Sequence, residues 1–96
     1  MDIGEISEIS ELRKQIDAID RELVELYRRR METVGAIGQY KRAHGLPVLD
    51  SGREKSLLDK VAKQAGEAYE EGIRELYQLL LEQSRRHQER DGGAEG

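Results

Sequence analysis

Apolar residues recur at steps of three and four along the N-terminal part of the chain. They occupy the positions Ile9, Leu12, Ile16, Ile19, Leu23, Leu26, Val34 and Ile37. This spacing places them on one helical face and predicts a first helix that begins between Glu5 and Ser10 and runs to about Ala43. Gly45 suits the position just after a helix, and Pro47 cannot continue one, so both mark the helix end.

Two shorter helices are predicted in the rest of the chain. The second begins at Ser51 and ends near Gly66, and the third runs from about Tyr69 to Arg90. Apolar residues at helical spacing mark the inward faces of both: Leu57, Leu58, Val61, Ala62 and Ala65 on the second, and Ile73, Leu76, Tyr77, Leu80 and Leu81 on the third. The pattern therefore predicts an all-α fold with one long and two shorter helices.

The length of the first helix implies a partner for its apolar face. At 1.5 Å per residue, about 38 residues reach about 57 Å, whereas a compact domain of this size has a radius of gyration of about 12–13 Å. Two shorter helices cannot cover it, so we expect a second copy of the chain, although a coiled-coil partner would meet the same need. We expect one domain over residues 1–90 and a disordered tail over residues 91–96.

Composition excludes several classes of function. The 96 residues contain no Cys and only two His, so disulfides and thiolate metal sites are ruled out, and we expect neither a metal nor a cofactor. The net charge of -4 argues against a general nucleic-acid binder. No apolar run approaches the roughly 20 residues that span a bilayer, and the N-terminus lacks the features of a secretory signal. We therefore expect no membrane partner and a cytoplasmic location.

Polar residues occupy positions on the apolar faces of all three predicted helices. Arg30 lies seven residues after Leu23 and seven before Ile37, in the centre of the apolar stripe. The others are Lys41 on the first helix, Glu54 on the second, and Ser84 and Gln88 on the third. Because burying a lone charge is costly, a set of inward polar groups with more cations than acids indicates a small anion inside a helix bundle.

Each of these residues also has a purely structural explanation. Arg30 could belong to a solvated basic run or to an ion pair between helices. Lys41 could favour the dipole at a helix C-terminus. Ser51 and Glu54 fit an S-x-x-E capping box. Ser84 and Gln88 could mark the frayed end of a surface helix. The joint occurrence of such residues on three helix faces is what favours a binding site.

The order of these residues resembles the all-helical chorismate mutase family from about Glu11 to Gln88. The matching segments are Leu12-Arg13, Ile16 to Asp20, Arg30, Gly38 to Lys41, Pro47 to Asp50, Arg53-Glu54, and Leu79 to Ser84 with Gln88. The I-D-x-I-D start, the lysine before the turn and the D-x-x-R-E segment together are specific. The resemblance implies an isomerase that rearranges chorismate to prephenate in aromatic amino-acid biosynthesis. It also implies an intertwined homodimer of three-helix chains with two equivalent active sites.

The resemblance assigns four residues to the substrate's side chain and the breaking bond. Arg30 and the partner subunit's Arg13 would hold the two carboxylates of chorismate, as guanidinium groups do by paired hydrogen bonds. Lys41 and Gln88 would bond the ether oxygen, where negative charge grows as the bond breaks. Helical spacing alone points to Arg30, Lys41 and Gln88 but not to Arg13, which lies at the edge of the apolar stripe.

The resemblance assigns four further residues to the ring and the rest of the pocket. Glu54 would take the ring hydroxyl, aided by the backbone at Asp50. Arg53 and Ser84 would complete the pocket around a carboxylate. Arg53 lies in the first turn of a helix, where a cation is slightly unfavourable, and this also hints at a use.

Other functions stay open. An isochorismate-pyruvate lyase would share the fold and much of the cationic pocket, but the Arg53-Glu54 pair favours the mutase. A non-catalytic helical dimer or interaction module would use its buried polar residues to set helix register. A nucleic-acid role for the run Arg28-Arg29-Arg30 is disfavoured because Glu25 and Glu32 flank it. The chain could also associate with another enzyme of the aromatic pathway.

Overall fold

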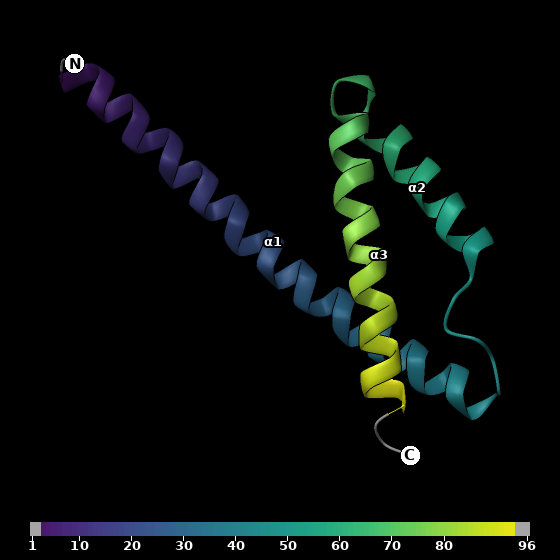
Figure 1. Ribbon diagram of the computed structural model, residues 1–96. Helices are drawn as coiled ribbons and strands as arrows, with labels where there is room; N and C mark the ends of the chain where they lie inside the picture. The colour runs from purple at the N-terminus through teal and green to yellow at the C-terminus, as the bar shows by residue number, and fades with distance from the viewer. Residues whose placement is uncertain (1–2, 94–96) are drawn as a thin grey trace. The chain divides into compact units, whose positions relative to one another are not determined.

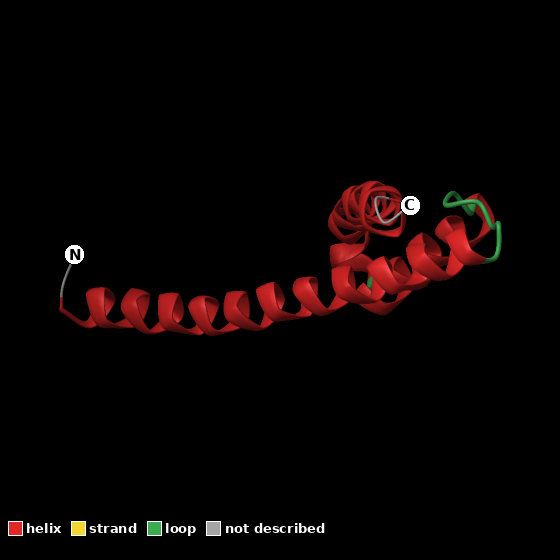
Figure 2. Cartoon of the chain, turned by 90° about the horizontal axis from the view of Figure 1, so that it is seen from below, coloured by secondary structure: helices red, strands yellow, loops and turns green. Residues whose placement is uncertain are grey.

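The computed structural model describes residues 3–93, which are helical apart from short connections (Figures 1 and 2). α1 spans Ile3–Ala43, α2 spans Ser51–Ala65, the 3-10 helix η1 spans Glu67–Tyr69, and α3 spans Glu70–Gly93. No strand occurs in this range. The prediction of an all-α chain with one long and two shorter helices is confirmed.

The helix ends differ from the predicted ones at the two termini. α1 begins at Ile3, slightly before the predicted start, and ends at Ala43 as predicted. α3 continues to Gly93, so residues 91–93, expected in the tail, are helical. Extending an existing helix fixes few residues for each added hydrogen bond, which explains such extra turns. Residues 94–96 lie outside the described residues, and the disordered tail there stays a prediction.

The chain divides into two units, Met1–Arg30 and Met31–Gly96, and α1 contributes to both. The first unit consists of helix alone in its described part, and its apolar residues are exposed: Ile9, Leu12, Ile16, Ile19, Leu23 and Leu26. They form the N-terminal part of the predicted apolar stripe. No described residue of the first unit covers them.

The second unit contains a small core. Its buried apolar residues are Val34 on α1, Val61 and Ala62 on α2, and Leu81 on α3. α2 and α3 form an antiparallel hairpin across η1, because Glu54 pairs with Arg85 and the later Asp59 pairs with the earlier Arg74. The Arg74–Asp59 distance is 3.2 Å, but both side chains are well exposed, so this pair contributes at most about 1 kcal/mol.

One predicted core residue of α3 is not in the core. Leu76, placed on the inward face from the sequence, is 46% exposed, whereas Ile73, Tyr77 and Leu80 are half-buried as expected. Leu76 lies about 140° around the helix axis from the buried Leu81. This angle places the Leu76 side chain at the edge of the packed face. The inward face of α3 is therefore narrower than the sequence predicts.

Candidate active site

The end of α1 fixes the position of Lys41. The Leu46 N–H donates to the Lys41 carbonyl oxygen at 2.8 Å, and the Gly45 N–H donates to the Arg42 carbonyl oxygen at 3.3 Å. These two bonds form a Schellman motif, in which Gly45 adopts a φ of 65° without the steric cost that a side chain would bring. The Lys41 Nζ donates to the Val48 carbonyl oxygen at 2.8 Å. The ammonium is therefore held against the loop that leads to α2.

The C-terminal part of α1 meets α3 at Gly38. A Cβ atom built on Gly38 would lie 2.9 Å from the Gln88 Cα atom and 3.0 Å from the Gln88 carbonyl oxygen. Real Cβ atoms essentially never come closer than 3.0 Å to a neighbour, so this approach requires glycine. Lys41 lies three residues further along α1, on the same helical face. The contact therefore places Gln88 against the helical turn of α1 that precedes Lys41.

Two polar residues of α3 are buried one helical turn apart. Ser84 is 4% exposed and Gln88 is 9% exposed, so the predicted inward direction of both is confirmed. The Ser84 hydroxyl donates to the Leu80 carbonyl oxygen at 2.6 Å. The Gln88 Oε1 atom is buried without a hydrogen-bond partner, at a cost of about 1–3 kcal/mol. Because an amide can turn over, this side chain can offer a ligand either an acceptor or a donor.

Glu54 of α2 forms an ion pair with Arg85 of α3. The Arg85 Nη1 atom lies 2.5 Å from the Glu54 Oε1 atom and 2.6 Å from the Oε2 atom. The Glu54 side chain is 22% exposed and the Arg85 side chain 32% exposed, so the pair is partly shielded from water. Glu54, predicted to receive the ring hydroxyl of the substrate, thus already has a cationic neighbour.

Asp50 caps the N-terminus of α2. Its Oδ1 atom accepts the Arg53 N–H at 3.0 Å, and its carbonyl oxygen accepts the Glu54 N–H at 3.0 Å. The capping-box explanation of Ser51 and Glu54 is therefore wrong, because Ser51 is the first helical residue and the Glu54 carboxylate bonds Arg85. Both Asp and Ser suit a cap, but Asp50 is the residue with the non-helical backbone that a cap needs. Arg53 is exposed in the first turn.

The two predicted carboxylate clamps lie in the unit Met1–Arg30. Arg13 is exposed on α1, whereas Arg30 is half-buried and makes polar or ring contacts of its own. The other predicted site residues all lie in the unit Met31–Gly96. The structure packs Gly38, one helical turn before Lys41, against Gln88 and places Glu54 beside α3. That all eight residues act on one ligand stays a prediction.

Arg85 is the residue of this region that the sequence analysis missed. It lies four residues after the buried Leu81, so the helical spacing that indicated Ser84 and Gln88 also places Arg85 near the inward face. Its neighbour Arg86 is exposed, and an Arg-Arg pair on a helix is typical of a solvated surface. The spacing from Leu81 is the signal that could have found it.

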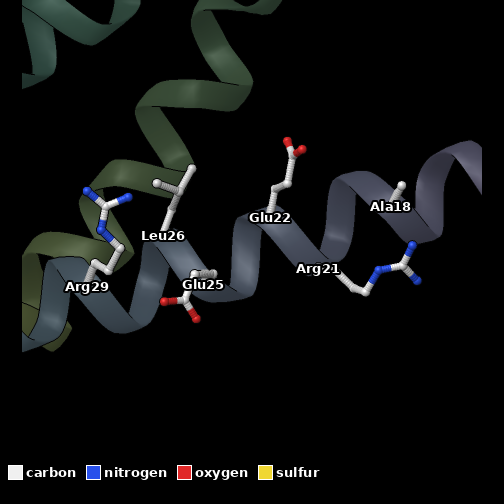
Figure 3. Close-up of a pocket in the computed structure, with 6 residues that line it drawn as sticks. All are labelled: Ala18, Arg21, Glu22, Glu25, Leu26 and Arg29. Carbon is white, nitrogen blue, oxygen red and sulfur yellow. The ribbon is translucent and has the colours of Figure 1, made fainter.

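A hollow on α1 contains none of the predicted site residues. It is lined by Ala18, Arg21, Glu22, Glu25, Leu26 and Arg29. In Figure 3 the Glu22 side chain projects to one side of the helix and those of Arg21 and Glu25 to the other, so the charged groups do not converge. A ligand site needs convergent polar groups, and we do not consider this hollow a candidate.

Residues 3–93 contain neither a metal cluster nor a membrane-spanning helix. No group of three or more metal-ligating side chains there could hold an ion. No helix within the same range has the length and apolar character that would let it cross a membrane. The expectation of a reaction without metal or cofactor stays a prediction.

The family match and the similar proteins point to the same family. The family described as chorismate mutase type II matches residues 12–89 of this chain. A chorismate mutase from Methanocaldococcus jannaschii is 30% identical over 83 residues, which cover 83% of this chain and 83% of that protein. A 4-amino-4-deoxychorismate mutase from Streptomyces venezuelae is 35% identical over 63 residues, which cover 66% of this chain and 61% of that protein. No solved structure gives a significant match.

Another relative is much longer than this chain. The T-protein of Haemophilus influenzae is 38% identical over 60 residues, which cover 62% of this chain. The same residues make up 16% of the T-protein. The chain therefore corresponds to a small part of that relative.

Proposed function

Because this chain belongs to the chorismate mutase type II family, we propose that it catalyses the rearrangement of chorismate to prephenate in aromatic amino-acid biosynthesis. The observation that carries the proposal is the close backbone contact between Gly38 and Gln88, because Lys41 lies one helical turn beyond Gly38 and the Gln88 side chain is buried. Both side chains can donate hydrogen bonds to one oxygen atom. Such donors at the ether oxygen of chorismate would accelerate the reaction.

The chemistry explains why donors at this oxygen accelerate the reaction. In a Claisen rearrangement a C–O bond breaks while a C–C bond forms, and negative charge grows on the ether oxygen. Lys41 uses one of its three N–H donors on the Val48 carbonyl oxygen. The remaining donors and the Gln88 amide would stabilise that charge more strongly in the transition state than in the ground state.

We propose that two arginines keep the substrate folded for reaction. Arg30 and the partner subunit's Arg13 would each bind one carboxylate through parallel hydrogen bonds. Holding the side chain over the ring in this way turns flexible chorismate into a near-attack conformer. This conformational restriction would supply the rest of the rate enhancement, beyond the electrostatic stabilisation of the ether oxygen.

We propose that the active molecule is an intertwined homodimer. Residues such as Leu12, Ile16 and Leu23 are about half exposed on α1. The second unit buries few apolar side chains, which is a thin core for a chain of this size. A second copy would cover the exposed stripe and would supply Arg13, so dimer formation and a complete site would be linked.

The loss of chorismate absorbance on adding the purified protein, with prephenate identified as the product, tests the proposal. We expect Lys41→Ala to lower kcat/KM on the order of 100-fold or more, because it removes the cation at the ether oxygen. Lys63→Ala, at an exposed lysine of α2, is the matched control and should retain full activity. Circular dichroism and light scattering should show that both variants keep their helices and their association state. A wild-type protein that does not convert chorismate contradicts the proposal.

Two rival functions have their own tests. An isochorismate-pyruvate lyase would release pyruvate from isochorismate faster than it converts chorismate. That result would favour the lyase over the mutase. A non-catalytic helical dimer would keep its partner binding in Arg30→Ala and Lys41→Ala, and it would leave chorismate unchanged. The buried Gln88 Oε1 atom, which has no hydrogen-bond partner, favours a ligand over such a purely structural role.

We further propose that the protein works in the cytoplasm beside another aromatic-pathway enzyme. Support comes from a bifunctional chorismate mutase/prephenate dehydratase of Aquifex aeolicus, which is 30% identical over 81 residues that make up 22% of that protein. An equivalent arrangement here would bring prephenate directly to the enzyme that consumes it. Sedimentation of this protein and of a purified enzyme that consumes prephenate, alone and mixed, measures this association.

A further inference from the structure

Arg85 is a charged residue of the site for which the proposed function has no role. Its guanidinium bonds both oxygens of the Glu54 carboxylate, at 2.5 and 2.6 Å. It follows the buried Ser84 directly and precedes the buried Gln88 by three residues, so it belongs to the turn of α3 that carries both. Arg85 therefore lies beside the position at which Glu54 would meet the substrate.

The ion pair changes what Glu54 can bind. A lone carboxylate in a partly buried position attracts a cation, whereas a carboxylate paired with a guanidinium carries no net charge as a unit. The pair still accepts a neutral donor, because two carboxylate oxygens offer about four lone-pair positions and Arg85 uses only part of them. Glu54 with Arg85 is thus suited to a hydroxyl group.

The alternative substrate class follows from the name of the Streptomyces venezuelae relative. In 4-amino-4-deoxychorismate an amine replaces the ring hydroxyl, and an aliphatic amine is protonated at neutral pH. An ammonium within hydrogen-bond distance of Glu54 would also lie a few ångströms from the Arg85 guanidinium. Two like charges at that separation repel strongly in a partly shielded site.

We propose that Arg85 determines substrate specificity: paired with Glu54, it makes the site select the neutral ring hydroxyl of chorismate against the ring ammonium of 4-amino-4-deoxychorismate. The inference rests on the proposed function and names the substrate class of the same site. Arg85 acts through Glu54 and through its own charge, so it is a positioning residue that need not touch the reacting atoms.

The test compares kcat/KM for the two substrates on the same sample of each protein, so that any loss of folded protein cancels in the ratio. The wild type should prefer chorismate, and Arg85→Gln should shift the ratio toward the amino substrate by about tenfold or more. Arg85→Lys keeps the charge and should stay within about threefold of the wild type. Arg86→Gln, with the same charge change at an exposed neighbour, should leave the ratio unchanged.

A second measurement needs no variant. The amino substrate should inhibit chorismate conversion by the wild type only with an inhibition constant at least about tenfold above the KM for chorismate. Tighter inhibition, or an unchanged ratio in Arg85→Gln, overturns the inference and leaves the proposed function standing. An equal shift in Arg86→Gln also overturns it, because net charge and not the ion pair would then be the cause. A wild type inactive on both substrates overturns the proposed function and this inference with it.

Discussion

At the residue scale, the candidate site depends on a residue that has no side chain. Gly38 lets the backbone of α1 approach the Gln88 backbone, and in the proposed site this approach would set where the Gln88 amide lies relative to Lys41. An ammonium and an amide that share one oxygen atom must be placed within a fraction of an ångström to act together. The positioning of both groups therefore rests on the space at position 38.

The variant Gly38→Ala measures this dependence. Alanine normally favours a helix by about 0.5–1 kcal/mol over glycine, but here its Cβ atom would meet the Gln88 backbone. We expect a net loss of about 1–3 kcal/mol in the free energy of unfolding, and a fall in kcat/KM on the order of tenfold to 100-fold. Gly72→Ala in the first turn of α3, where a Cβ atom meets nothing within 4 Å, is the control. It should not destabilise the protein, and equal losses in both variants would argue against the contact.

The sequence predicted the direction of individual side chains where local periodicity determines it. Ser84 and Gln88 were expected to face inward from their spacing, and both are buried. Arg85 was not expected, because its partner Glu54 lies 31 residues away and no local pattern reports a pairing between two helices. The roles of these residues toward a ligand stay predictions.

At the element scale, residues at the helix ends explain where α1 stops and α2 starts. Gly45 and Pro47 correctly predicted the end of α1, because one suits a left-handed backbone and the other cannot continue a helix. The sequence correctly predicted that α2 starts at Ser51, but the structural explanation of Ser51 and Glu54 as a capping box placed the cap at Ser51 instead of Asp50. Two adjacent residues suited to capping cannot be distinguished by type, because the choice depends on which of them keeps a non-helical backbone.

Alanine substitutions at these two adjacent positions test the observed cap. Asp50→Ala removes the acceptor of the Arg53 N–H and should lower the free energy of unfolding by about 1 kcal/mol. Ser51→Ala should change it by less than about 0.5 kcal/mol, since Ser51 lies inside the helix. Urea titrations at one fixed protein concentration provide both values. A larger loss of unfolding free energy in Ser51→Ala than in Asp50→Ala would contradict the Asp50 cap and favour the capping box of Ser51 and Glu54.

At the scale of the whole molecule, the sequence indicated association but not its geometry. The first helix is too long for the rest of the chain to cover, and its apolar residues from Leu12 to Leu26 are indeed exposed. Which surface of another chain covers them depends on packing between two molecules, and no periodicity within one sequence reports that. The assignment of Arg13 to the other subunit therefore came from the resemblance to a family.

The dimer can be tested by mixing inactive variants, because α1 carries both Arg13 and Lys41. In the proposed homodimer each site takes Arg13 from one chain and Lys41 from the other. Arg13→Ala and Lys41→Ala should each inactivate both sites. After unfolding and refolding together in equal amounts, about half of the dimers would be mixed, and each mixed dimer would hold one intact site. We expect about one quarter of wild-type activity, whereas no recovery would contradict the sharing of Arg13.

The same arrangement has a genetic consequence. Two alleles that each fail alone would complement one another in a cell that expresses both, provided that one alters Arg13 and the other alters Lys41. In a mixed dimer both substitutions would fall in the same site. That site would be inactive, and the other site would keep both Arg13 and Lys41. In the proposed dimer, a helix that serves two sites would thus make the pair of subunits, and not the single chain, the unit on which selection acts.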